Sequence, residues 1–283
     1  MFKLIDSHLH FFDFENGDYH WLKPDNPPFW QDKSCIARSF TQGDLQLSPT
    51  FELSGYVHIE AGYDNDAFWR EIEWLEKNNT LPFKAVASAD LTRSPEKFAK
   101  DIIKLKQYRS VTGVRHIFDE QTLSLLNNSY VLKNLEQLAA NSLSFDLQMP
   151  FNDSKATNCL LSCMGSLSQL RVIINHAGFP PLTNDPAWET WLSSINSVAK
   201  YPNVAIKCSG WEMKCRDYNL NWVNDVIYEC IKAFSHDRVM LASNFPLCLF
   251  SESYQSFWEQ FLQMSPDTMQ ALLYDNACYW YKF

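Results

Sequence analysis

Short apolar runs alternate with longer amphipathic runs along the whole chain. The short runs are rich in Val, Ile and other apolar residues, which is typical of strands that are covered on both faces. Eight such strands are predicted, at Lys3–Phe11, Leu53–Ala61, Phe83–Leu91, Val111–Phe118, Ser144–Met149, Arg171–Gly178, Asn203–Gly210 and Arg238–Pro246. Most of them end in a Gly, a Pro or a polar residue, so a loop is expected after each.

The runs between these strands repeat their apolar residues with a helical period. Asp66–Asn78 places Phe68, Ile72 and Leu75 on one face, and Ser94 followed by Pro is a typical helix start. Further helices are predicted at Tyr130–Asn141, Ser154–Leu167, Pro186–Ala199, Trp222–Phe234, Ser253–Met264 and Pro266–Tyr274. A helix after almost every strand favours an α/β fold, a distorted (β/α)8 TIM barrel, over a doubly wound open sheet.

One long segment interrupts this alternation. Residues 12–52 are polar and aromatic and contain Pro24, Pro27 and Pro28. Because the segment directly follows the first strand, we expect it to form a long loop over the barrel mouth. No break in composition divides the rest of the chain, so residues 1–283 are predicted to form a single domain.

The composition limits the class of partner. The chain has 283 residues, with 24 Lys and Arg against 33 Asp and Glu, which gives a net charge of −9. This balance argues against nucleic acid and against an anionic membrane as partners. Neither a signal segment nor an apolar stretch of membrane-spanning length is present, and the eight Cys form no C-x-x-C pair. We therefore expect a cytoplasmic protein that acts on a small molecule. A homodimer is left open.

The predicted strand ends carry an unusual number of histidines. Five of the seven histidines lie on predicted strands at or near these ends: His8, His10, His58, His116 and His176. A TIM barrel builds its site at the C-terminal ends of its strands. His8 and His10 are spaced i, i+2, so both point to the same face of the first strand. Two imidazoles that converge in this way hold one cation or polarise one carbonyl oxygen.

Four ordered motifs resemble one family. D-S-H-L-H-F-F-D at 6–13 resembles the first-strand signature of the amidohydrolase superfamily. Asn175-His176-Ala177-Gly178, Lys207-Cys208-Ser209-Gly210 and Ala242-Ser243-Asn244-Phe245-Pro246 resemble its amidohydrolase-related branch, in the right order. The resemblance spans nearly the whole chain. It implies an activity close to the sugar-lactone and pyrone-dicarboxylate lactone hydrolases, with metal-dependent decarboxylases as more distant relatives.

Two positions depart from the pattern of that superfamily. Gln148 stands where a fifth-strand His often binds metal, and Asn244 stands where an Asp usually activates water. An amide is a poor zinc ligand and is not a base at neutral pH. His8, His10 and His176 could still form a weak Zn²⁺ site with a water as fourth ligand. Whether a divalent metal ion is bound at all is left open.

These residues suggest how a cyclic ester would be hydrolysed. We expect the pair His8 and His10, with or without a metal, to polarise the lactone carbonyl. Asn244 can orient a water but cannot take its proton, so His176 or His58 must act as the base. The catalytic set is therefore predicted as His8, His10, His176 and Asn244.

The substrate is expected to be anionic or polyhydroxylated. Arg115 and Lys207 are cations on strands that should be buried, and we expect them to face an anionic group. The full predicted substrate-binding set is Tyr19, Trp21, His58, Arg115, His116, Gln148 and Lys207. Glu60 and Asp90 are interpreted as helix-capping groups.

Two alternative functions compete with a lactone hydrolase. One is a metal-dependent decarboxylase or amide hydrolase of the same superfamily. The other is a non-catalytic barrel that binds sugar acids, which Asn244 would fit because an amide cannot serve as the base.

Overall fold

The computed structural model describes residues 1–283 and contains one parallel sheet of eight strands in the order β1 to β8. The strands are β1 Phe2–Leu9, β2 Phe51–Ile59, β3 Phe83–Ser88, β4 Val111–Ile117, β5 Ser144–Gln148, β6 Val172–Ile174, β7 Val204–Cys208 and β8 Val239–Leu241. All seven neighbouring pairs are parallel. Each predicted strand is therefore present and in the predicted order.

The sheet closes on itself through the residues that follow β8. Leu9 forms a parallel bridge with Phe245. The amide of His10 donates to the carbonyl of Phe245 at 2.6 Å, and the amide of Asn244 donates to the carbonyl of His8 at 2.9 Å. The (β/α)8 barrel in a single domain is thereby confirmed. The closure also fixes the backbone of Asn244 directly beside that of His8.

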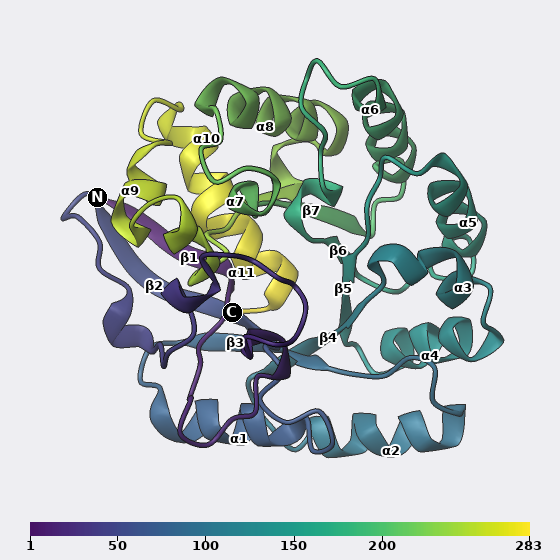
Figure 1. Ribbon diagram of the computed structural model, residues 1–283. Coiled ribbons are helices and arrows are strands. Elements are labelled where there is room, and N and C mark those ends of the chain that lie inside the picture. The colour runs from purple at the N-terminus through teal and green to yellow at the C-terminus, as the bar shows by residue number, and fades with distance from the viewer.

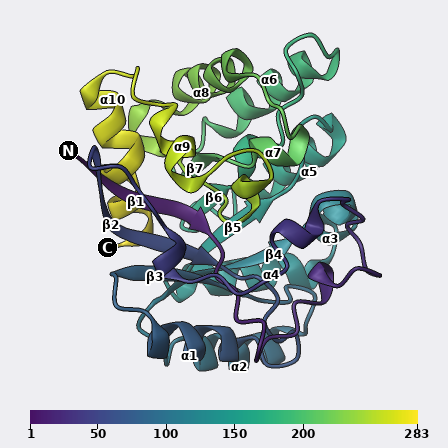
Figure 2. The same ribbon diagram turned by 60° about the vertical axis from the view of Figure 1, so that its left-hand side comes forward.

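Helices surround the sheet on its outer face (Figure 1). Their bounds are α1 Trp69–Asn78, α2 Pro95–Leu105, α3 Thr122–Leu126, α4 Ser129–Ala140, α5 Ser154–Met164, α6 Ala187–Val198, α7 Trp211–Lys214, α8 Leu220–Phe234, α9 Tyr254–Glu259, α10 Pro266–Gln270 and α11 Asn276–Tyr281. Figure 2 shows α1 and α2 together on one side of the barrel, with α6 and α8 on the opposite side. None of the helices is long and apolar enough to cross a membrane.

The C-terminal helix α11 closes the N-terminal end of the barrel. Its Trp280 and Tyr281 pack in one cluster with the inward-facing Ile5, Val57 and Ile173. The carbonyl of Tyr281 also accepts a hydrogen bond from Thr112 on β4 at 3.2 Å. With this end filled by apolar side chains, the opposite end is left for a site.

Every strand ends earlier than predicted, and the two with the largest shortfall, β6 and β8, carry candidate site residues beyond their ends. The run Arg171–Gly178 was predicted as one strand, but β6 stops at Ile174 and His176–Gly178 form a 3-10 turn. The run Arg238–Pro246 likewise stops at Leu241, because the backbone and hydroxyl of Ser243 bind the buried carboxylate of Asp6. His176 and Asn244 therefore lie in turns beyond their strands. The predicted helix Ser253–Met264 is also wrong in length, since α9 ends at Glu259.

The loop of residues 12–52 is held by internal cations. The ammonium of Lys33, although buried, donates to the carbonyls of Trp21, Lys23 and Asn26 at 2.6–3.1 Å. Such backbone carbonyls replace the water that a buried ammonium loses. A second tie joins the loop to the barrel, because Arg216 pairs with Asp32 at 2.7 Å. The segment thus has an ordered shape without long helices, and its last two residues, Phe51 and Glu52, belong to β2 and not to the loop.

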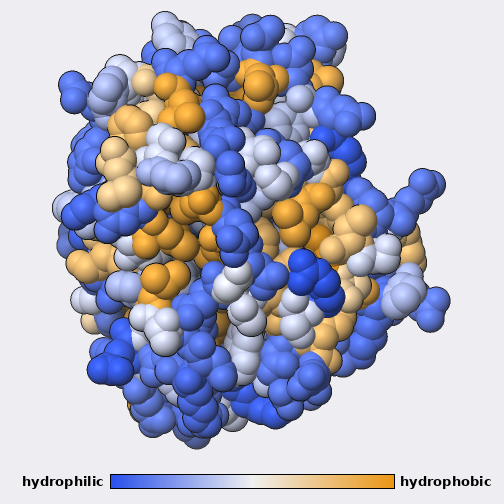
Figure 3. Space-filling view, turned by 90° about the vertical axis from the view of Figure 1, so that its left-hand side faces the viewer, coloured by the Kyte–Doolittle hydropathy of each residue, from blue (hydrophilic) through white to orange (hydrophobic).

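Hydrophobic residues on the face shown in Figure 3 form patches that are separated by hydrophilic side chains. The patches on this face do not merge into one continuous apolar surface of the kind that marks an obligate interface. The homodimer stays a prediction.

Candidate active site

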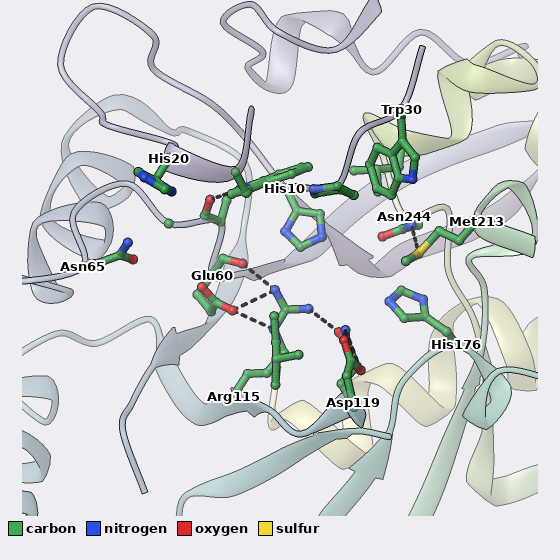
Figure 4. A pocket seen from close by; sticks show the side chains of 17 residues that line it. His10, His20, Trp30, Glu60, Asn65, Arg115, Asp119, His176, Met213 and Asn244 are labelled. Atoms are coloured by element: carbon green, nitrogen blue, oxygen red, sulfur yellow. Dashed lines mark hydrogen bonds and ion pairs between the residues drawn. The ribbon is translucent and has the colours of Figure 1, made fainter. Parts of the chain in front are cut away.

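A cavity of about 490 Å³ opens at the C-terminal ends of the strands (Figure 4). It is lined by His10, His20, Trp21, Pro28, Trp30, Glu60, Ala61, Gly62, Asn65, Arg115, Ile117, Asp119, Gln148, His176, Met213, Asn244 and Leu247. The loop of residues 12–52 contributes four of these residues: His20, Trp21, Pro28 and Trp30. The volume suits a single small ring with its substituents.

His10 presents an unprotonated nitrogen to this cavity. Its Nδ1 lies 2.8 Å from the carbonyl oxygen of Ile59. A carbonyl can only accept, so Nδ1 carries the proton and Nε2 keeps its lone pair. Burial, with Arg115 as the next contribution, holds the pKa of His10 well below its ordinary value. His10 is therefore a neutral acceptor at physiological pH.

His8 lies beneath the cavity, between His10 and His176. Its ring centroid is 5.1 Å from that of His10 and 4.6 Å from that of His176. Behind it, Nζ of Lys207 lies 3.5 Å from His8 Nδ1 and 2.6 Å from Oδ2 of Asp146. An ammonium group only donates, so Nδ1 of His8 accepts and its proton lies on Nε2, which has no protein partner. His8 and His10 thus hold opposite tautomers.

Burial lowers the pKa of Lys207 to about 8, and the attraction of Asp146 opposes that shift. Lys207 remains mostly charged at neutral pH. Burial, followed by the positive charge of Lys207, holds the pKa of His8 well below its ordinary value. Lys207 therefore acts on the imidazole of His8 from inside the barrel, without facing the cavity.

His176 reaches the cavity from a strained turn. Its backbone φ is 53°, in the left-handed region that L residues rarely adopt. Nδ1 lies 3.0 Å from the hydroxyl of Ser209, and burial lowers the pKa of His176 to about 3. Gly210 leaves room for this ring, because a Cβ there would lie 2.6 Å from His176 Nδ1. The turn, the serine and the glycine together fix where the imidazole sits.

Asn244 faces the same cavity from a second left-handed residue, with φ at 57°. Its Nδ2 donates to Oε1 of Glu212 at 2.6 Å and lies 3.6 Å from the sulfur of Met213. Its Oδ1 is buried and has no protein partner. Burial raises the pKa of Glu212 to about 7. The carboxylate that the sequence lacks at position 244 is thus present one layer behind it, on α7.

The opposite wall of the cavity is a paired network around Arg115. Its Nε donates to Oε1 of Glu60 at 2.8 Å, Nη2 to the carbonyl of Glu60 at 2.7 Å and Nη1 to Oε1 of Gln148 at 3.1 Å. Nε2 of Gln148 in turn lies 3.3 Å from both oxygens of Asp119. Arg115 has five N–H donors, which is more than these three hydrogen bonds use, so donors remain for a ligand. Glu60 is a cavity residue and not the capping group that the sequence suggested.

The structure brings together only part of the predicted site. His10, His176 and Asn244 line the cavity, as do Trp21, Arg115 and Gln148. His8 and Lys207 lie beneath it, and Tyr19 is held inside the loop by a hydrogen bond from the amide of Asp13. Both nitrogens of His58 are taken, Nδ1 by the amide of Phe11 and Nε2 by Glu71. His116 lies outside the cavity and accepts from the amide of Leu91.

These placements remove His58 as a base, because an acceptor needs a free lone pair. Several cavity residues were not predicted: His20, Trp30, Asn65, Asp119, Met213 and Leu247. They lie in loops, in short 3-10 turns or, for Met213, in the four-residue helix α7, and no periodic pattern describes such segments. Glu60 directly follows β2, and that position was the one signal that could have identified it.

The three histidines do not fit a metal site. No three His, Cys, Asp or Glu side chains lie so that they could together hold a metal ion. The proton on His8 Nε2 leaves that atom without a lone pair, and the ammonium of Lys207 behind the ring opposes a second cation. His10 and His176 supply two imidazoles, one fewer than the three protein ligands of a catalytic zinc.

Curated relatives match over nearly the whole chain. An uncharacterised protein of Sinorhizobium fredii is 29% identical over 302 residues, covering 99% of this chain and 98% of its own. An L-fucono-1,5-lactonase of Burkholderia multivorans is 23% identical over 265 residues, covering 88% of this chain and 84% of its own.

Solved structures share the fold and the whole length. An amidohydrolase of Burkholderia multivorans, crystallised with bound zinc, has a TM-score of 0.81 at 20% identity and 99% coverage of both chains. A 2-pyrone-4,6-dicarboxylic acid hydrolase of Pseudomonas putida has a TM-score of 0.72 at 19% identity, covering 100% of this chain and 98% of its own. A 5-carboxyvanillate decarboxylase of Novosphingobium aromaticivorans, with bound manganese, has a TM-score of 0.68 at 14% identity, covering 100% and 97%.

The family itself is shown by sequence, since a barrel alone would not identify it. The amidohydrolase family model matches residues 5–283, and the chain therefore belongs to the amidohydrolase family and is a hydrolase.

Proposed function

We propose that the protein hydrolyses the lactone of a sugar acid. The observation that carries this proposal is the unprotonated Nε2 of His10, fixed by the carbonyl of Ile59, in a cavity that also holds the unpartnered Oδ1 of Asn244. Two acceptors in one small cavity orient a water through both of its hydrogens. The lactonase relative and the pyrone-dicarboxylate hydrolase neighbour support the same reaction class.

In this mechanism His10 is the base. The water oxygen attacks the lactone carbonyl while Nε2 of His10 takes a proton from it. His176 serves as donor, because the hydroxyl of Ser209 can donate to its Nδ1 and leave a proton on Nε2 for the developing oxyanion. The tetrahedral intermediate then breaks its bond to the ring oxygen, which receives the proton from His10 and leaves as a hydroxyl group. The product is an open-chain hydroxy acid.

These roles exchange those that the sequence suggested. His10 and His8 were expected to polarise the carbonyl, and His176 or His58 to act as base. The hydrogen bond to Ile59 makes His10 an acceptor, and His8 lies below the cavity. The low pKa of His10 makes it a weak base, which suffices for a lactone because its ester is activated by the ring.

The charges of the cavity favour a neutral, polyhydroxylated substrate. The charge of Arg115 is compensated by Glu60, and Asp119 adds a further carboxylate. Carboxylates accept hydrogen bonds from sugar hydroxyls, whereas two substrate carboxylates would face them with like charge. Trp21 and Trp30, with ring centroids 6.3 Å apart, give the cavity an apolar surface for a sugar ring. A sugar lactone therefore fits better than a pyrone dicarboxylate.

The metal-dependent reaction is the second candidate, favoured by the zinc and manganese in the structural neighbours. A library of aldonolactones and pyrone dicarboxylates, assayed with a pH indicator, separates the substrate classes. The same assay after chelation, with plasma emission spectrometry of the purified protein, separates the mechanisms. Turnover of aldonolactones that survives chelation supports the proposal. Hydrolysis of no lactone, or activity that returns only with a divalent ion, contradicts it.

A further inference from the structure

Glu212 touches no part of the cavity but holds one of its residues. The residue is 1% exposed, and Oε1 of its carboxylate accepts from Nδ2 of Asn244 at 2.6 Å. We propose that Glu212 is a positioning residue that fixes the side-chain amide of Asn244 with its oxygen toward the cavity. This inference rests on the proposed lactone hydrolysis, in which that oxygen orients the attacking water.

An asparagine amide needs such a device because its two ends are nearly the same size. Rotation by half a turn would place the NH2 group in the cavity, where it would donate to the water instead of accepting from it. The partner must therefore be able to accept but not to donate. The carboxylate of Glu212 meets this condition when it is ionised, which its pKa of about 7 makes the main form above neutral pH, and the sulfur of Met213, 3.6 Å away on the same side, is also an acceptor. The flipped amide would bring Oδ1 against an oxygen of Glu212.

The fold holds Glu212 rigidly in this position. Helix α7 begins immediately after Gly210, whose φ of 75° allows the sharp change of direction out of β7. The carbonyl of Glu212 accepts from Nη1 of Arg216 at 2.6 Å. The same guanidinium stacks over the ring of Phe250 at 3.9 Å. Burial and these contacts leave the carboxylate little freedom, so the amide orientation is set before a substrate arrives (Figure 4 shows the amide beside Met213).

The arrangement lets an oxygen in the cavity accept a hydrogen bond without placing a negative charge there. A carboxylate at position 244 would present a negative charge to the substrate, next to Glu60 and Asp119. Here the negative charge stays behind the amide, and only a neutral oxygen faces the ring. The cavity gains an oriented acceptor without further like-charge repulsion.

The first experiment compares two substitutions of similar size on the lactone that the wild-type enzyme hydrolyses best. Glu212→Met removes the acceptor, and kcat is expected to fall on the order of 100-fold with KM changed less than about threefold. Glu212→Gln keeps an acceptor oxygen but can also pair with the flipped amide, so the expected loss is only about fivefold. An unchanged kcat in Glu212→Met would overturn the proposal. So would a Glu212→Gln variant as inactive as Glu212→Met, because Glu212 would then itself take the proton.

A second pair of variants tests the contact directly and does not depend on one variant folding well. In Asn244→Asp two carboxylates meet and must share a proton, which we expect to lower kcat about 100-fold. Glu212→Gln in the same chain supplies an NH2 donor to the new carboxylate and is expected to restore at least about tenfold. Additive effects of the two substitutions would show that the side chains are not coupled.

A measurement without turnover separates this inference from the proposed function. The side-chain NH2 resonances of Asn244, assigned by their loss in Asn244→Ala, should move in Glu212→Met and stay close to their wild-type positions after saturation with any product acid. If the resonances do not respond to Glu212→Met, the inference fails even for an active lactonase. If they respond in a protein that hydrolyses no lactone, the contact stands and the proposed function fails.

Discussion

Two walls of the cavity differ in how their polar atoms are satisfied. The wall formed by Glu60, Arg115 and Gln148 is a paired network in which the guanidinium of Arg115 meets the carboxylate of Glu60 at 2.8 Å and keeps N–H donors for a ligand. The wall formed by His10, His176 and Asn244 ties each side chain from behind and leaves one atom of each toward the cavity. Side chains that are paired with a counter-charge hold the shape of the cavity and select a ligand. Side chains that are fixed from behind, with one atom left without a partner, can take part in the reaction. We therefore assign binding to the first wall and chemistry to the second.

The largest effect is expected when the base is removed from the reactive wall, which is the wall formed by His10, His176 and Asn244. His10→Ala should lower kcat by about 1,000- to 10,000-fold with little change in KM, because the imidazole acts on a proton that moves in the transition state. Steady-state kinetics on the preferred lactone measure it, with circular dichroism to check folding. His236→Ala is the matched control, since His236 is exposed beside the start of β8, at the other end of the barrel. Unchanged turnover in His10→Ala would show that His8 and His10 have a structural role only.

The paired wall should respond in a different kinetic parameter. Arg115→Met is expected to lower kcat/KM about 100-fold, mainly through KM, because substrate donors are lost. It should also destabilise the fold by about 3 kcal/mol, because Glu60 is left buried without its partner. Adding Glu60→Gln should restore most of the stability but not kcat/KM, as measured by urea unfolding and kinetics. A loss in kcat alone would erase the distinction between the walls.

A smaller effect is expected where a backbone supports the reactive wall. Gly210→Ala would place a Cβ 2.6 Å from Nδ1 of His176 at a residue whose φ is 75°, so the ring must shift. We expect kcat to fall about tenfold. Gly165→Ala is the control, because nothing lies within 4 Å of its new Cβ and its φ is −60°. Equal kinetics for the two variants would show that the position of His176 is not critical.

The smallest expected effect is a pH dependence of stability behind the reactive wall. Burial raises the pKa of Glu212 from 4.5 to about 7 in the folded chain. The folded state therefore binds more protons than the unfolded state, and stability falls as pH rises through this window. Between pH 6 and pH 8 the wild type should lose about 1 kcal/mol more than Glu212→Gln in urea unfolding. Parallel curves for the two proteins would mean that the carboxyl group is not buried as described. Asp6, whose pKa burial raises to about 6, is present in both proteins and cancels.

Much of the barrel could be predicted from local pattern, because the period of apolar residues differs between a covered strand and an amphipathic helix. The i, i+2 spacing of His8 and His10, and the polar residues at the ends of β4, β5, β6 and β8, also follow from position along the chain. They indicated His10, Arg115, Gln148, His176 and Asn244 before any contact was known. Strand ends were predicted too long where a turn at His176 or Asn244 takes over from the ladder.

The roles of these residues were decided only by tertiary contacts. Glu212 lies 32 positions from Asn244, Arg115 lies 55 from Glu60, and Lys207 lies 199 from His8. No periodicity relates residues so far apart, because the folded barrel alone brings them within hydrogen-bond distance. The sequence alone does not distinguish whether a histidine accepts a hydrogen bond, donates one or binds a metal. The group behind its ring, a carbonyl for His10 and an ammonium for His8, selects among these by fixing where the proton lies.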